Sequence, residues 1–372
     1  MFVTDIVAEY ENGVYRVSAN AGGAPLWFES SDIDLRPAPE AFGSALLIPS
    51  LRNGCSLTID KAVSGKWLSN VEQLLDIFHE WWGYPKLMPE AAGCFIGRTA
   101  EVERTGLCFS AGVDSFFSLL RYDQEIDFLV TVQGFDFKLQ DATRIAALRS
   151  SLNIIAAETG VKSIIIRTNV REHPEFGKAP WEQTHGGVLA AVGHLLSDSM
   201  DQILISSSYA HVNESPWGTH RKTDPLWSSD RLQIIHFGAE LPRVEKLRAI
   251  AGEPLVREHL RVCWENLSAQ GNCSRCEKCI RTRLILADCG ELANYPGLEG
   301  EESLERDIGT LPLYKNMGLD FFYLLEKRRL KPEIENAIHK LIKRTKRTKS
   351  YSRNLAKRTL RKAWSLTGGR NR

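Results

Sequence analysis

The segment Leu107–Ser115 constrains the fold of this chain more than any other stretch. Its apolar start, its Ser110-Ala111-Gly112 turn and the apolar residues that follow at helical spacing predict a buried strand, a tight turn and a helix from about Asp114. Such a turn aims backbone N–H groups and the positive end of a helix at one point, which suits phosphate groups. The competing interpretation is a glycine-containing turn without a chemical role.

Strand and helix patterns alternate after this segment. Phe128–Val132, Ser163–Arg167 and Gln202–Ser206 have the apolar composition of buried strands, and Gln140–Thr159 and Gly186–Ser197 have helical patterns. This alternation predicts an α/β fold, a parallel sheet with helices on both faces. Ligands of such sheets bind beyond the carboxyl ends of the strands, where the Ser/Gly turn, Gly134, Thr168 and Ser207 all fall.

Three regions are expected within the 372 residues. Residues 1–100 predict a small α+β domain, with a hairpin turn at Asn12-Gly13 and an amphipathic helix over Trp67–Trp82 whose tryptophans pack in a core. Residues 101–300 predict a second domain, with the alternating strands and helices, the Ser/Gly turn and a cysteine cluster. Residues 301–372 predict a helical, basic extension.

The C-terminal region carries a strong positive charge although the whole chain has a formal net charge of only +1. From Lys327 to Arg372 there are 17 lysines and arginines against two glutamates. Such a tail either binds nucleic acid, contacts an acidic partner, or is a solvated extension. A second copy of the chain, as in a homodimer, is a further expected partner.

The sequence favours a cytoplasmic location. No apolar run approaches the roughly 20 residues needed to cross a membrane, so no membrane partner is expected. The first residues lack the basic and apolar regions of a signal peptide. In a reducing compartment, eight cysteines indicate metal binding and burial rather than disulfides.

Four of these cysteines form a C-x9-C-x2-C-x2-C pattern: Cys263, Cys273, Cys276 and Cys279. Two residues between cysteines let one turn point both sulfurs at the same ion, and four thiolates make a closed, structural Zn²⁺ site. An iron–sulfur cluster and four buried free cysteines are the alternatives. We expect zinc to brace the edge of the sheet. The other cysteines are isolated and expected to pack in the core.

The Ser/Gly turn resembles the PP-loop, S-G-G-x-D-S, of the ATP-pyrophosphatase (HUP-type) superfamily, from which Ala111 departs. With the four cysteines about 150 residues later, it resembles 7-cyano-7-deazaguanine synthase of queuosine biosynthesis and the wider class of synthase-like proteins. The resemblance covers about Gly106 to Asp288. It implies that ATP and Mg²⁺ are bound near the residues Ser110, Ala111, Gly112, Val113, Asp114, Ser115, Gly134 and Ser207, and that the cysteines hold zinc.

Further candidate catalytic residues are His185 and, in a polar loop, His220, Arg221 and Asp224. His220, Arg221 and the neighbouring Lys222 are expected to stabilise departing pyrophosphate, and Asp224 to contact a heterocycle or metal. Trp227 either stacks on a base or anchors the loop by burial, and His185 either donates to a phosphate or caps a turn. Asp114 is expected to orient the Ser/Gly turn or to hold Mg²⁺. His194, among apolar residues, is expected to be structural.

The expected activity is that of an ATP-dependent ligase. It forms AMP and pyrophosphate, adenylates a carboxylate or amide of a small, deazapurine-like molecule, and passes it to a nitrogen nucleophile. The alternatives are a PP-loop enzyme that thiolates or amidates a tRNA base, and a non-catalytic nucleotide-binding protein, for which Ala111 is the warning sign.

Overall fold

The computed structural model describes residues 1–97, 103–266, 271–311, 319–327 and 329–346. The chain divides into two compact units, Met1–Arg261 and Val262–Arg372. The boundary expected near residue 100 does not separate compact units. The strands of the first hundred residues belong to the same sheet as those that follow, because β3 (Ala24–Ser30) pairs antiparallel with β8 (Lys162–Thr168).

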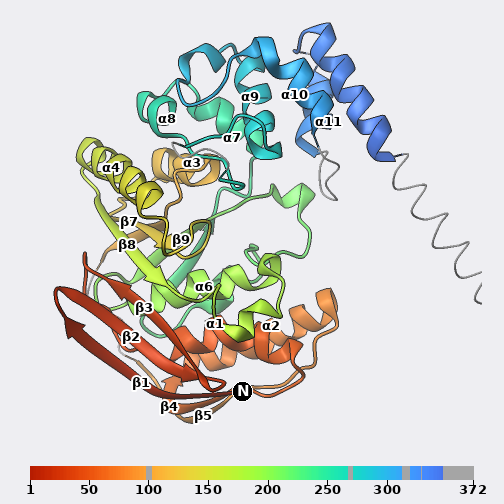
Figure 1. The fold of residues 1–372 in the computed structure, drawn as a ribbon. Helices are drawn as coiled ribbons and strands as arrows, with labels where there is room; N and C mark the ends of the chain where they lie inside the picture. The colour runs from red at the N-terminus through yellow and green to blue at the C-terminus, as the bar shows by residue number, and fades with distance from the viewer. Residues whose placement is uncertain (98–102, 267–270, 312–318, 328, 347–372) are drawn as a thin grey trace, which may run out of the picture. The chain divides into compact units, whose positions relative to one another are not determined.

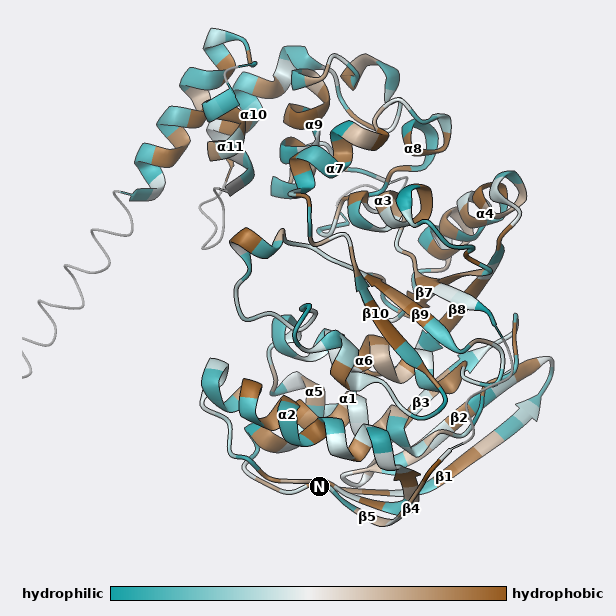
Figure 2. Ribbon diagram, turned by 180° about the vertical axis from the view of Figure 1, so that it is seen from behind, coloured by the Kyte–Doolittle hydropathy of each residue, from teal (hydrophilic) through white to brown (hydrophobic). Residues whose placement is uncertain are grey.

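The first unit is an α/β structure with a ten-stranded, mostly parallel sheet in the order β10-β9-β6-β7-β8-β3-β2-β1-β4-β5 (Figure 1). The predicted parallel part is confirmed: β6 (Thr105–Cys108), β7 (Phe128–Gln133), β8, β9 (Gln202–Ser206) and β10 (Gln233–Phe237). Figure 2 shows β9 and β10 as largely hydrophobic ribbons between helical layers, as expected of strands covered on both faces. The strand β10 was not predicted from the sequence.

The rest of the sheet is a meander of β1 (Phe2–Glu11), β2 (Val14–Ala21) and β3, extended beyond β1 by the parallel strands β4 (Thr58–Ser64) and β5 (Glu90–Phe95). The hairpin at Asn12-Gly13 is confirmed. Both residues have positive φ, 52° and 81°, as a two-residue hairpin turn requires.

Helices cover both faces of the parallel part of the sheet. Figures 1 and 2 place α3 (Val113–Arg121), α4 (Ala142–Thr159) and α7 (Arg243–Ile250) on one face and α1 (Pro39–Arg52) and α6 (Trp181–Leu195) on the other. Close packing of α1 on α6 requires Gly187, since a Cβ there would lie 2.3 Å from the Ser44 carbonyl oxygen. The other helices of this unit are α2 (Gly65–Trp82), α5 (Pro174–Gly177), α8 (Pro254–His259) and the 3₁₀ helices His211–Asn213 and Asp224–Trp227.

One hydrophobic core runs through both parts of the sheet. It joins Phe28 and Trp67 of the N-terminal segment to Ile203 of β9 and to Trp227. Trp67 is fully buried, as the amphipathic pattern of α2 predicted, and its indole N–H donates to the Ser44 hydroxyl at 2.9 Å. A shared core explains why the first hundred residues do not form a separate domain.

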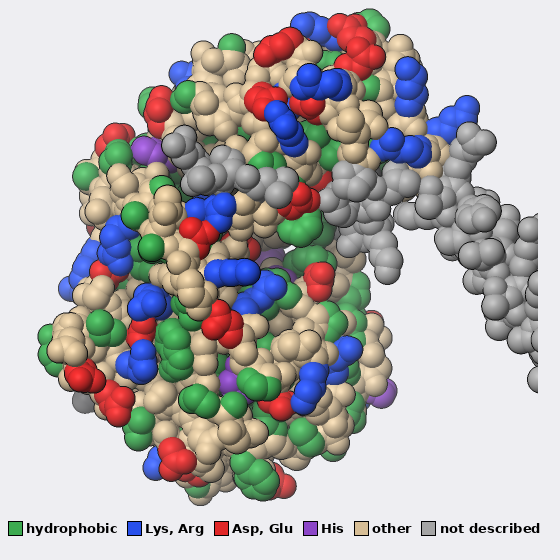
Figure 3. Space-filling view, in the orientation of Figure 1, with side chains coloured by type: hydrophobic (Ala, Val, Ile, Leu, Met, Phe, Trp, Pro, Cys, Tyr) green, Lys and Arg blue, Asp and Glu red, His purple; other side chains and the backbone are tan. Residues whose placement is uncertain are grey.

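The second unit is helical where the structure describes it. It contains α9 (Glu277–Asp288), α10 (Leu304–Thr310), α11 (Leu319–Lys327), a helix that begins at residue 332, and 3₁₀ helices at Leu292–Asn294 and Glu301–Ser303. Most of the expected basic tail, residues 347–372, lies outside the described residues. On the face shown in Figure 3, basic and acidic side chains are interspersed in each unit.

Candidate functional site

The Ser/Gly turn has the predicted strand–turn–helix form, between β6 and α3. The Ser115 hydroxyl lies inside the turn, where it accepts hydrogen bonds from the backbone N–H groups of Ser110 (3.3 Å) and Gly112 (3.1 Å). It also lies 3.4 Å from the Ser110 hydroxyl. Ser115 therefore holds the turn together, and the hydroxyl of Ser110 lies at the cavity described below.

Ala111 adopts a left-handed backbone conformation, with φ of 56°. An alanine Cβ is strained there, at a cost on the order of 1 kcal/mol relative to glycine. The Arg261 N–H donates to the Ala111 carbonyl at 2.8 Å and helps to hold this conformation. The residue that departs from the PP-loop pattern thus occupies a position that glycine would favour.

Asp114 forms ion pairs with two basic side chains of α7. Its carboxylate oxygens lie 2.7 Å from Arg243 Nη2 and 3.5 Å from Lys246 Nζ. Lys246 is buried and also donates to the Ser207 carbonyl at 2.6 Å. Burial lowers the pKa of Lys246, and the nearby Asp114 carboxylate opposes that shift. Arg243 and Lys246 were not identified from the sequence.

A cavity of about 260 Å³ lies at the carboxyl ends of β6, β7 and β9. From β6 the chain adds β7 and β8 on one side, and then β9 and β10 on the other side. Ligands of such sheets usually bind at this switch point, between β6 and β9. Of the predicted residues, Ser110, Asp114, Ser115 and His185 line the cavity. Ala111, Gly112, Val113, Gly134 and Ser207 are not among its lining residues.

The lining of the cavity includes both polar and apolar residues. Ser110, Ser115, Ser206, Ser208 and Thr219 contribute hydroxyl groups. Val130, Val132, Phe135, Leu148, Trp181 and Leu189 contribute the apolar surface. The rings of Phe135 and Trp181 meet edge to face, with centroids 4.9 Å apart, and the Arg261 guanidinium lies 3.8 Å from the centroid of the Phe137 ring. The hydroxyl groups suit charged oxygens, and the apolar side chains suit a flat ring.

The neighbouring backbone needs glycine at Gly134, although this residue does not line the cavity. Its φ is 106°, and a Cβ there would lie 2.1 Å from the Thr168 carbonyl oxygen. Ser207 is also occupied structurally, because its hydroxyl donates to the Tyr209 carbonyl at 2.6 Å. For both residues the structure shows a role in backbone geometry.

His185 is a neutral side chain at the cavity. Burial lowers its pKa. Its Nδ1 lies 2.9 Å from the Trp181 carbonyl and therefore carries the proton, which leaves Nε2 to accept from the Thr219 hydroxyl at 3.4 Å. The thiol of Cys108, also at the cavity, is kept protonated because burial raises its pKa to about 12.

His220, Arg221 and Asp224 form a separate cluster, and none of them lines the cavity. Asp224 is fully buried, accepts from the His220 N–H at 3.0 Å, and lies 2.7 Å from Nδ1 of His236 on β10. Arg221 pairs with Glu214 at 2.7 Å, and His220 Nε2 lies 3.4 Å from the same carboxylate. This geometry gives no support to the interpretation of His220 and Arg221 as groups that stabilise pyrophosphate, or of Asp224 as a contact to a heterocycle or metal.

Trp227 is fully buried in the core, so burial rather than base stacking is its observed role. His194 is buried beside it, and its Nε2 donates to the Trp227 carbonyl at 3.0 Å, in agreement with the structural role expected from the sequence. Burial lowers the pKa of His194 to about 3.

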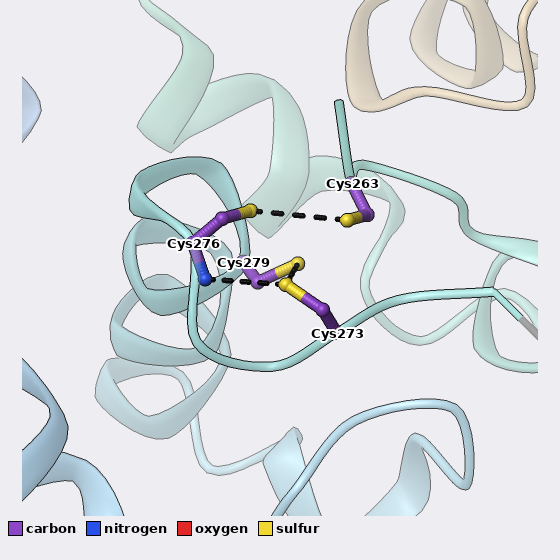
Figure 4. A group of neighbouring side chains, drawn as sticks. All are labelled: Cys263, Cys273, Cys276 and Cys279. Atoms are coloured by element: carbon purple, nitrogen blue, oxygen red, sulfur yellow. Dashed lines mark hydrogen bonds between the residues drawn. The ribbon is translucent and has the colours of Figure 1, made fainter. Parts of the chain in front are cut away.

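The four predicted cysteines come together in the second unit. Their sulfur atoms all lie within 4.8 Å of one another and point inward (Figure 4). The Cys273–Cys279 and Cys276–Cys263 sulfur pairs are 3.9 and 4.0 Å apart. Tetrahedral coordination with Zn–S bonds of about 2.3 Å requires sulfurs about 3.8 Å apart. These four cysteines can therefore bind a metal ion such as zinc.

The surroundings of the cysteines also fit a metal ion. The Cys276 N–H donates to the Cys273 sulfur at 3.2 Å, and hydrogen bonding from Cys279 lowers the pKa of the Cys276 thiol to about 5. Burial raises the pKa of Cys273 to about 11. The crowded sulfurs thus do not all ionise on their own, and a bound cation would favour the four-thiolate state.

Arg283 links the cysteine loop to α10. Its side chain is fully buried, donates to the Ser274 carbonyl at 2.8 Å, and pairs with Asp307 at 2.8 Å. Ser274, between Cys273 and Cys276, has φ of 60°. Arg283 therefore helps to hold the turn that presents two of the sulfurs.

Comparisons with protein-family models, with curated proteins and with solved structures found no match. The description of this protein therefore rests on its own structure. It has an α/β unit with a cavity at the switch point of the sheet, and a helical unit with four clustered cysteines.

Among the described residues, none of the helices has the length and apolar character needed to cross a membrane.

Proposed function

We propose that this chain is an ATP-dependent enzyme that forms AMP and pyrophosphate. In this proposal it adenylates a carboxylate or amide oxygen of a small molecule for attack by a nitrogen nucleophile, as the resemblance to 7-cyano-7-deazaguanine synthase implies. The observation that carries the proposal is the cavity at the sheet's switch point, lined by Ser110, Asp114 and Ser115 of the Ser/Gly turn.

The walls of the cavity match the parts of the proposed reactants. The apolar lining residues, with Phe135 and Trp181, suit a purine-like ring, and the residues with hydroxyl groups suit phosphate oxygens. Neutral His185 offers an uncharged Nε2 acceptor and does not neutralise an anionic substrate. The protonated Cys108 thiol is a poor nucleophile, which favours nitrogen over sulfur transfer.

The reaction has two balanced steps. First, a substrate oxygen attacks the α-phosphorus of MgATP, the bond to the bridging oxygen breaks, and pyrophosphate leaves with that bond's electron pair. Next, a nitrogen nucleophile adds to the activated carbon, loses a proton, and expels AMP. Positioning of the oxygen in line with the leaving group supplies most of the catalysis expected of the protein.

The four-cysteine site is proposed to hold a structural zinc ion. All four positions would be filled by thiolates, so the ion would have no open position for a water or a substrate. Its chemistry would be to stabilise the fold of the second unit. Iron in place of zinc on metal analysis would favour the tRNA-modifying alternative.

The test is to identify the products of ATP. The purified protein is incubated with MgATP, ammonia and a panel of small carboxylates, and nucleotides are separated by chromatography. AMP and pyrophosphate formation is expected, with loss in Ser110→Ala and retention in Ser163→Ala, a serine of β8 that does not line the cavity. ADP as the product would overturn the proposed reaction, and ATP binding without turnover would indicate a non-catalytic protein.

A further inference from the structure

Two basic side chains of α7 converge on the one carboxylate of the Ser/Gly turn. Arg243 donates to Asp114 through both Nε (3.2 Å) and Nη2 (2.7 Å). Lys246 Nζ approaches the other carboxylate oxygen at 3.5 Å. The positive charges of Arg243 and Lys246 therefore both face the Asp114 carboxylate, and the Glu240 carboxylate also interacts electrostatically with Lys246.

The cluster lies where a polyphosphate would arrive. Asp114 lines the cavity, as Ser110 does, and Arg243 and Lys246 contact Asp114 although they are not themselves lining residues. Lys246 is anchored to the Ser207 carbonyl, directly after β9, so it joins the ends of α3 and β9 across the switch point of the sheet. The side chain of Arg243 is 20% exposed and that of Asp114 is 18% exposed, so solvent reaches both partners.

The energetics of the cluster favour exchange of one anion for another. Burial makes the Lys246 ammonium costly unless an anion faces it. A pyrophosphate group supplies more negative charge and more acceptor oxygens than a single carboxylate, and arginine binds it through two parallel hydrogen bonds. The carboxylate can turn away because it belongs to a partly exposed side chain at the first turn of α3.

We propose that Arg243 and Lys246 form the binding site for the pyrophosphate portion of ATP, and that Asp114 is an internal competitor that occupies both cations until this group arrives. The inference rests on the proposed function for the identity of the ligand. In this role, removal of the Asp114 charge strengthens the binding of pyrophosphate. If Asp114 were a Mg²⁺ ligand, removal of its charge would weaken the binding of MgATP.

The test measures binding of inorganic pyrophosphate to the full chain by calorimetry, with EDTA present so that Mg²⁺ does not contribute. Arg243→Gln and Lys246→Met are expected to weaken binding about tenfold or more, since each loses a charge-assisted hydrogen bond. Asp114→Asn, which keeps an acceptor oxygen but loses the charge, is expected to tighten binding by about three- to tenfold.

Arg121→Gln is the matched control. Arg121 also joins α3 to α7 and the residues after it, through the Ala249 carbonyl (2.6 Å) and Glu253 (3.3 Å), but it lies at the opposite end of α3. This variant should bind pyrophosphate as the unmodified protein does. Because Lys246 is buried, the thermal stability of the Lys246→Met variant is measured as well, to check that it folds. Arg243 is partly exposed, so its variant tests the site even where the Lys246 variant fails to fold.

Three results would overturn the inference: no pyrophosphate binding by the unmodified protein, unchanged binding in Arg243→Gln, or weaker binding in Asp114→Asn. The last would indicate that Asp114 itself serves the ligand. The proposed function fails separately. If pyrophosphate binds as expected but ATP yields no AMP, the anion site stands without the reaction; if AMP forms and Arg243→Gln changes nothing, the reaction stands without this site.

Discussion

The four cysteines of the second unit come from the single stretch Cys263–Cys279, whereas the side chains at the cavity of the first unit come from segments spread between Cys108 and Arg261. In the cysteine site, sequence spacing sets the geometry directly. In the cavity, residues with hydroxyl groups and apolar residues come together because β6, β7 and β9 end at one edge of the sheet. A local site can be identified from spacing alone, and a dispersed site requires the topology.

The largest expected effect separates the two units. Cys276→Ala removes a thiolate from the four-cysteine site, so we expect loss of bound zinc and unfolding of the second unit, since metal-binding energy is folding energy in such sites. The first unit should stay folded. Metal analysis together with hydrogen exchange measured by mass spectrometry checks both expectations.

Cys289→Ser is the control for this variant. Cys289 belongs to the same unit, but its thiol donates to the Ile285 carbonyl at 3.1 Å and it is not part of the metal-binding cluster. Full zinc content in Cys276→Ala would contradict the proposed ligand set.

The buried Arg283–Asp307 pair tests whether the cysteine turn depends on support from α10. Arg283→Met leaves Asp307 buried without its main partner, and breaking such a pair typically costs about 3–5 kcal/mol. Faster hydrogen exchange is expected around Ser274 and α10, with little change in the first unit. Arg275→Met, on an exposed side chain of the same loop, is the control. Equal protection in both variants would show that the metal ion alone holds the turn.

Acid should weaken the first unit through its buried histidines. Burial lowers the pKa of His194 to about 3, below the ordinary value near 6.5, so the unfolded chain takes up the proton first. The stabilisation is complete above about pH 6.5 and is lost as the pH falls toward 3. At pH 5 the loss from this group is about 2 kcal/mol.

Urea unfolding at pH 7 and pH 5 measures this loss. His194→Gln keeps a donor toward the Trp227 carbonyl and should flatten the pH dependence, whereas His211→Gln, at an exposed position, should leave it unchanged. If the free energy of unfolding of His194→Gln still falls between pH 7 and pH 5, other groups cause the acid sensitivity.

The smallest expected effect is that of glycine in place of Ala111. Ala111→Gly relieves the strain of a positive φ but makes the unfolded chain more flexible, so the free energy of unfolding should rise by no more than about 1 kcal/mol. Ala111→Val places a β-branched residue in the same conformation and should lower it by about 2 kcal/mol. Urea unfolding checks both. Ser274, with φ of 60° in the cysteine turn, provides the parallel comparison as Ser274→Gly.

Much of the fold could be predicted from the sequence. The apolar strands at Phe128–Val132 and Gln202–Ser206, the hairpin at Asn12-Gly13 and the helix over Trp67–Trp82 each have a local pattern, and the structure contains all of them. The strand Gln233–Phe237 was missed; it is as long as Gln202–Ser206, but His236 interrupts its apolar run. The separate N-terminal domain was wrong as a compact unit, because the pairing of β3 with β8 leaves no local signal.

The residues of the candidate site were also predicted only in part. Ser110, Asp114, Ser115 and His185 were selected from the sequence and line the cavity, but His220, Arg221 and Asp224 lie in a cluster of their own. These three residues follow β9 in the sequence, but the loop that carries them does not bring their side chains to the cavity. Arg243 and Lys246 carry no motif, and only the packing of α7 on α3 brings them to Asp114.

The sequence by itself determined the parallel strand–helix core and the clustering of the four cysteines. Both follow from local patterns, namely the periodicity of apolar residues and the spacing of the cysteines. Tertiary structure alone decided that Asp114 is neutralised by Arg243 and Lys246, that Ala111 is strained, and that Trp227 is buried. These features depend on which surfaces meet when apolar area is removed from water, and residues distant in the chain supply those surfaces.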